Sequence, residues 1–147
     1  MLTGRIVAFS RRHRLAMSCV VSVWAGVIFA FSSVSGAVVP TDLPFWRLLE
    51  RKGAHVFEYF VLCLLAFHWL RLHIPDIRFR GSVFLSGTLS LLYAFSDELH
   101  QCFVFGREGK FSDVGIDAIG IILAMIAVGI MKRKRHDRYY PPRNRYE

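Results

Sequence analysis

Charged residues are absent from long parts of this 147-residue sequence, although its formal net charge is +8. Four stretches hold at most one Asp, Glu, Lys or Arg each: residues 15–39, 53–70, 81–96 and 114–131. Because 54% of the residues are hydrophobic, this is not a disordered chain. A soluble helical bundle is the alternative, but its helices need a polar outer face, and residues 15–39 offer none.

The uncharged stretches have the length of membrane crossings. At 1.5 Å per residue, a helix needs about 20 residues to cross the hydrocarbon core of a bilayer. The third stretch reaches that length if its helix continues past Asp97 to about Phe103. The sequence therefore predicts an all-α integral membrane protein, a bundle of four transmembrane helices.

Cysteine is scarce and irregularly spaced. The three cysteines, Cys19, Cys63 and Cys102, form no CxxC pair, so they predict neither a disulfide framework nor a thiolate metal site. We interpret them as small apolar packing residues.

Motifs that mark common enzyme classes are also missing. The sequence has no HExxH zinc motif and no Gly-x-Ser-x-Gly nucleophile motif. No phosphate-binding loop surrounds Gly115, Gly120 or Gly129, which are better interpreted as close-packing positions. These absences favour a non-catalytic protein over an enzyme without deciding the question.

The Lys and Arg residues predict the orientation in the membrane. Fourteen of the 19 lie in the N-terminal arm, the connection between the second and third helices, and the C-terminal tail; five lie in the other two connections. Because Lys and Arg concentrate on the inner side, both termini are predicted to be cytoplasmic. We expect a basic N-terminal arm at 1–14, a membrane domain at 15–131 and a basic, disordered tail at 132–147.

Two basic segments allow other interpretations. Arg11, Arg12 and Arg14 precede an apolar run, as in a signal peptide, but the run is long enough to predict a retained anchor. The basic residues 132–135 directly follow a predicted helix, which indicates membrane anchoring. The lipid bilayer is therefore an expected partner, and nucleic acid is not.

Polar residues interrupt the apolar helices at three places. The second helix carries a stripe at helical spacing, the third ends in a polar block, and the fourth begins with two carboxylates one turn apart. These residues are Lys52, His55, Glu58 and Tyr59, then Asp97, Glu98, His100 and Gln101, then Asp113 and Asp117, with Arg107 in the connection before the last pair. The predicted orientation places all three groups at the outer membrane boundary.

Carboxylates outnumber fixed cations in this predicted outer site. The site has five acidic residues, and its only fixed cations are Lys52 and Arg107. An unpaired ionised carboxylate is costly inside a membrane, so Glu58 and Asp117 must face the bundle and find partners. Protonation of the acids, protonated His55 or His100, or a bound cation would each resolve the surplus.

These polar residues resemble the VanZ-like family of small bacterial membrane proteins. The resemblance covers about residues 52–131 and rests on three patterns: Lys52-x-x-His55-x-x-Glu58-Tyr59, Asp97-Glu98-x-His100-Gln101 with Gly106-Arg107, and Asp113-x-x-x-Asp117-x-x-Gly120. It implies a multi-pass protein of the bacterial cytoplasmic (inner) membrane, connected with the cell envelope. The family is named for a member that confers teicoplanin resistance, and the resemblance implies no particular reaction. The eleven polar residues named above are the site residues that match it.

Three functions remain open. The site would bind a lipid-linked cell-envelope component or a lipoglycopeptide, with Lys52 and Arg107 gripping an anionic group, and so contribute to glycopeptide tolerance. Alternatively, a divalent cation would support a metal-assisted enzyme that acts on a lipid-linked envelope substrate. Its candidate ligands are His55, Glu58, Asp97, Glu98 and His100. In the third hypothesis, the polar residues only pair with one another and hold the helices together.

Overall fold

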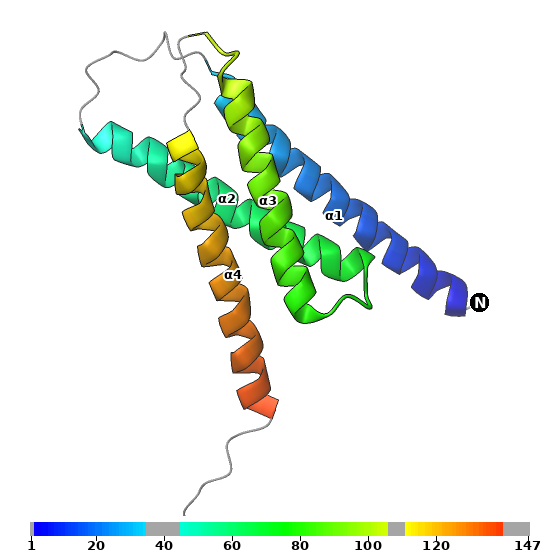
Figure 1. Ribbon diagram of the computed structural model, residues 1–147. Helices are drawn as coiled ribbons and strands as arrows, with labels where there is room; N and C mark the ends of the chain where they lie inside the picture. Colours follow the sequence, from blue (N-terminus) through cyan, green and yellow to red (C-terminus); the bar gives the residue numbers. More distant parts are fainter. Residues whose placement is uncertain (1, 35–44, 106–110, 140–147) are drawn as a thin grey trace, which may run out of the picture.

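The described part of the protein is entirely helical. The computed structural model describes residues 2–34, 45–105 and 111–139, and the side chains of 11–34, 52–105 and 112–134 within them. Four α-helices occupy most of these residues: α1 (Leu2–Ser32), α2 (Phe45–His73), α3 (Phe79–Gln101) and α4 (Phe111–Tyr139) (Figure 1). No strand occurs in these three ranges, which confirms the all-α prediction.

Three of the four helices contain a segment that is long and apolar enough to cross a membrane. These segments are Arg11–Ser32, Lys52–His73 and Ser112–Lys134. The predicted third crossing, α3, is not apolar enough to join them, because serines and the acids of its last turns lower its hydropathy. The prediction of four crossings is therefore supported for three helices.

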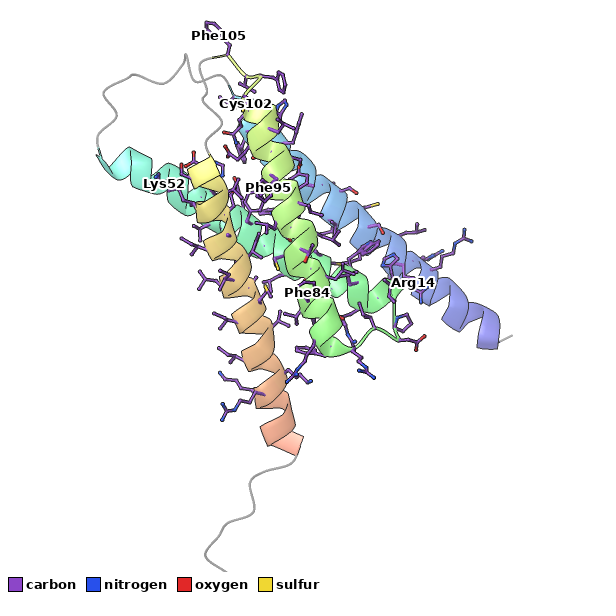
Figure 2. All side chains as sticks on the ribbon, viewed as in Figure 1. Arg14, Lys52, Phe84, Phe95, Cys102 and Phe105 are labelled. Carbon is purple, nitrogen blue, oxygen red and sulfur yellow. The ribbon has the colours of Figure 1, made fainter. Side chains whose placement is uncertain are left out.

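Several polar residues of α3 face the inside of the bundle. Ser82, Ser86 and Ser90 recur every four residues and are at most 1% exposed. Large apolar side chains cover the outer side of the same helix, as Phe84 and Phe95 show in Figure 2. The low hydropathy of α3 thus comes largely from its packed face, and its exposed face is mostly apolar.

The first and last helices of the chain extend beyond the predicted spans. α1 begins at Leu2, within the predicted N-terminal arm, and α4 continues past residue 131 to Tyr139. The residues that follow Met131 are mostly Lys and Arg, whose helix propensity is high, so the helix can continue into the basic tail. The last residues of the predicted tail, 140–147, lie outside the described range.

The core lies between α2, α3 and α4 and includes Ile28 of α1, which packs on the side of α2 and α3 (Figure 1). Its buried residues are Ile28, Tyr59, Leu62, Cys63, Ala94, Val114, Ile121 and Ala124. Cys63 packs in this core as predicted, whereas Cys19 and Cys102 are exposed free thiols. α2 and α4 approach closely at Gly120, where an added Cβ atom would overlap the carbonyl oxygen of Val56.

Side-chain hydrogen bonds attach α1 to its neighbours. Trp24 Nε1 donates to the carbonyl oxygen of Glu58 on α2 at 3.0 Å, and the Tyr93 hydroxyl on α3 donates to the carbonyl oxygen of Ala25 at 2.7 Å. Nearer the other end of α1, Trp69 Nε1 donates to Ser18 Oγ at 2.9 Å. Since most of the α1 surface is exposed, these contacts are important for holding α1 in place.

Removing one of these bonds tests the attachment of α1. We expect Tyr93→Phe to lower the free energy of unfolding by about 1 kcal/mol, because it removes one interhelical hydrogen bond in a membrane protein. Ser96→Ala is the control, since the Ser96 hydroxyl donates a hydrogen bond within α3, to the carbonyl oxygen of Tyr93. Unfolding in detergent, followed by circular dichroism, measures both variants. Equal stabilities would contradict the role of the Tyr93 contact.

Candidate functional site

A histidine and a carboxylate meet between α2 and α4. His55 Nδ1 and Asp117 Oδ1 lie 3.2 Å apart, and they form an ion pair when the imidazole is protonated. The Asp117 side chain is completely buried, whereas that of His55 is 22% exposed. Because a buried carboxylate is costly without a partner, the pairing accounts for the position of Asp117 inside the helix bundle.

A second carboxylate connects α3 to α1. Asp97 Oδ2 accepts hydrogen bonds from Ser32 Oγ at 2.7 Å and from Gln101 Nε2 at 3.1 Å. All three side chains are buried. Ser32 was not among the predicted site residues, because a serine at the end of an apolar run carries no signal of its own. Only the packing of α1 against α3 identifies it.

Tyr59 lies among the buried acids. Its side chain is completely buried on α2 and interacts electrostatically with Asp97 and Glu98 of α3 and with Asp117 of α4. Within the part of the chain that the structure describes, the buried atoms for which no hydrogen-bond partner is found include the Tyr59 hydroxyl oxygen, Asp97 Oδ1 and Asp117 Oδ2. In this region of the bundle, one atom on each of α2, α3 and α4 could thus form a further hydrogen bond.

We call this group the buried polar cluster. It comprises Ser32, His55, Tyr59, Asp97, Glu98, Gln101 and Asp117. The cluster draws on all four helices at the end of the bundle where α3 ends and α4 begins (Figure 1). Six of its seven members were predicted from the sequence, and the structure brings them together.

The other predicted residues lie around the cluster. His100 stacks on Phe29 with ring centroids 4.4 Å apart, and its Nε2 lies 3.0 Å from Ser33 Oγ, so it contacts the end of α1. Glu58 and Asp113 are half-buried, and each interacts electrostatically with one member of the His55–Asp117 pair.

The two predicted cations are not part of the described cluster. Lys52 is exposed on α2 (Figure 2). Arg107 lies outside the described residues. The cluster itself contains three carboxylates and one histidine.

The predicted metal ligands do not assemble in this structure. All five candidates, His55, Glu58, Asp97, Glu98 and His100, are described. Within the described ranges, no three His, Cys, Asp or Glu side chains converge in an arrangement that would hold a metal ion. A metal site thus has no geometric counterpart among these residues.

Comparison with known proteins relates the chain to a membrane-protein family. The family described as VanZ/LLP1 matches residues 17–132. The chain is similar to the uncharacterized membrane protein YwnJ of Bacillus subtilis (strain 168), with 33% identity over 99 residues. This match covers 67% of the chain and 63% of the relative, so the chain spans less than two thirds of the length of that protein. No solved structure gives a significant match. The chain therefore belongs to the VanZ/LLP1 family.

Proposed function

We propose that this membrane protein binds a lipid-linked cell-envelope component or a lipoglycopeptide at the outer face of the bacterial cytoplasmic membrane, and thereby contributes to teicoplanin tolerance. The observation that carries the proposal is the buried polar cluster, to which all four helices contribute. Ionisable groups inside a membrane domain are costly, so a cluster with several carboxylates favours a functional site. Membership of the VanZ/LLP1 family supports the connection with the envelope.

The proposal includes α3 as a fourth crossing and both termini in the cytoplasm. The inward-facing Ser82, Ser86 and Ser90 and the outward apolar residues of α3 support its insertion, because these three serines would not face lipid. Exposed basic side chains lie at the end of the bundle opposite the cluster: Arg11, Arg12, Arg14, Arg71, Arg78, Arg80 and Lys132. Lys and Arg concentrate on the cytoplasmic side, so this distribution supports an outward-facing cluster.

Apolar surface beside the cluster would receive the lipid part of the ligand. Phe103 and Phe105 directly follow α3 and are each 82% exposed. Figure 2 shows Phe105 at the cluster end of the molecule, beyond the last turn of α3. Exposed aromatic residues at a helix end are typical of the membrane interface, where lipid headgroups and chains meet.

Helix pairing is a second explanation that specific contacts favour. The Ser32–Asp97–Gln101 contacts join α1 to α3, and the His55–Asp117 pair joins α2 to α4. Pairing accounts for one carboxylate oxygen of Asp97 and one of Asp117. It does not account for Asp97 Oδ1, Asp117 Oδ2 or the Tyr59 hydroxyl, for which no partner is found among the described residues. A binding site accounts for the hydrogen-bonded oxygens, which hold the side chains in place, and for the three remaining atoms, which would contact the ligand.

Expression in a glycopeptide-susceptible bacterium tests the proposal. We expect the native chain to raise teicoplanin tolerance and Asp97→Asn and Glu98→Gln to return it to the level of cells without the gene. Each variant removes a buried negative charge at nearly constant shape. Asp76→Asn, an exposed change in the turn between α2 and α3, should retain tolerance. The minimum inhibitory concentration is measured at equal membrane levels of each protein. No gain with the native chain would contradict the proposal.

A further inference from the structure

We propose that the buried polar cluster receives a primary ammonium group of the bound molecule, held by Asp97, Asp117 and Tyr59. The inference rests on the proposed function, because it specifies which chemical group enters the same site. It is carried by three buried atoms of the cluster for which no hydrogen-bond partner is found within the described ranges: Asp97 Oδ1, Asp117 Oδ2 and the Tyr59 hydroxyl oxygen. Each belongs to a side chain that is at most 3% exposed.

Both carboxylates are held by one oxygen and leave the other available. Asp97 Oδ2 is occupied by Ser32 and Gln101, so Oδ1 remains. Asp117 Oδ1 is occupied by His55, so Oδ2 remains. The existing hydrogen bonds therefore orient both groups before a ligand arrives, which lowers the entropy lost on binding.

The number of hydrogen bonds favours an ammonium group. Two of the available atoms are carboxylate oxygens, which only accept when ionised, and the Tyr59 hydroxyl oxygen can accept as well. A primary ammonium group has three donors and no acceptor, so it would satisfy one atom on each of α2, α3 and α4. A hydroxyl group has a single donor: it could accept from the Tyr59 hydroxyl and donate to one carboxylate oxygen, but the other carboxylate oxygen would be left without a donor.

Charge favours the same group. When ionised, Asp97 and Asp117 carry two negative charges against one positive charge on protonated His55, so a cation would reduce the negative surplus of these three groups. An anionic phosphate would enter beside three carboxylates and would be repelled. Lys52 is exposed outside the cluster. The anionic group that Lys52 is predicted to bind would therefore be a different part of the ligand.

Lipid headgroups and soluble amines with matched quaternary controls test this inference. The full chain is placed in nanodiscs of phosphatidylcholine, with or without phosphatidylethanolamine, and its thermal unfolding is measured. Ethanolamine and choline are titrated separately into the phosphatidylcholine nanodiscs. We expect the primary amines to raise the unfolding temperature and the quaternary ones, which lack N–H donors, to have no effect. A response to phosphatidylethanolamine alone identifies a lipid headgroup as the source, and a response to ethanolamine identifies a soluble amine.

Single-atom variants connect the response to the cluster. Tyr59→Phe keeps the ring and removes the hydroxyl, and Asp97→Asn and Asp117→Asn remove one charge each. We expect each to weaken amine binding by roughly tenfold or more, since each removes a hydrogen bond to a charged group. Asp76→Asn, at the other end of the bundle, should bind as the native chain does. Equal amine binding by Tyr59→Phe and Asp97→Asn would overturn the inference, as would equal stabilisation by sodium chloride at the same concentration.

The outcomes also separate this inference from the proposed function. If the native protein binds teicoplanin but primary and quaternary amines act alike, the ammonium assignment is wrong and the proposed function stands. If primary amines bind through Tyr59 and Asp97 but the native chain confers no tolerance, the ammonium site stands and the proposed function is wrong.

Discussion

Replacing Gly120 by alanine is expected to destabilise the protein strongly, although alanine favours a helix. The added Cβ would overlap the carbonyl oxygen of Val56 and would lie 3.0 Å from the backbone nitrogen of Phe60. Both are backbone atoms of α2, so no side-chain rotation can relieve the overlap, and α2 and α4 must separate. Helix propensity would contribute about 1 kcal/mol in favour of alanine, whereas overpacking costs typically 1–3 kcal/mol or more. Because the overlap involves backbone, we expect a net loss of about 2 kcal/mol or more.

Gly115 provides the matched control on the same helix. A Cβ added at Gly115 would meet no atom within 4 Å, so Gly115→Ala should be neutral or stabilising by up to about 1 kcal/mol. Unfolding of both variants in mixed micelles, followed by circular dichroism, gives the difference. If the two variants had equal stability, the close approach of α2 and α4 at Gly120 would be refuted.

The second large effect is expected when His55 is removed. His55→Ala leaves the carboxylate of Asp117 completely buried without its histidine partner. Loss of one member of a buried ion pair costs about 3–5 kcal/mol, and the partial exposure of His55 places the expected loss at about 2–4 kcal/mol. Asp117→Asn should cost less, about 1 kcal/mol, since the amide retains a polar partner for the imidazole and leaves no buried charge.

A double-mutant cycle measures the interaction itself. Once Asp117 is asparagine, removing His55 no longer strands a buried charge, so the double variant should be more stable than the sum of the single losses implies. We expect a coupling energy of about 1–3 kcal/mol from the same unfolding assay. Additive losses would show that the 3.2 Å contact contributes nothing to stability.

The fold was predictable from the sequence because the apolar stretches are long and nearly uncharged. A segment such as 114–131, with Asp117 as its single charged residue, has few alternatives to a buried or membrane-spanning helix. The prediction was weakest at α3, because a count of polar residues does not tell which face of the helix they occupy. The tertiary structure places Ser82, Ser86 and Ser90 inside the bundle.

The candidate site was predictable residue by residue, but its pairings were not. The spacing of His55 and Tyr59, one turn apart on one face of α2, follows from the period of the helix. That Asp117 is the partner of His55, and that Ser32 holds Asp97, depends on how each helix is rotated against its neighbours. Many side chains set that rotation together, so no local pattern encodes it.

By itself, the sequence determined the helices, the number of charges and the set of polar residues that one end of the bundle would contain. Only the tertiary structure decided which carboxylate oxygens are occupied, that Lys52 stays outside the cluster, and that α4 lies against α2 at Gly120. The physical reason is that helical periodicity is a property of neighbouring residues, whereas the contacts of Asp97, Asp117 and Tyr59 arise from the packing of several helices at once.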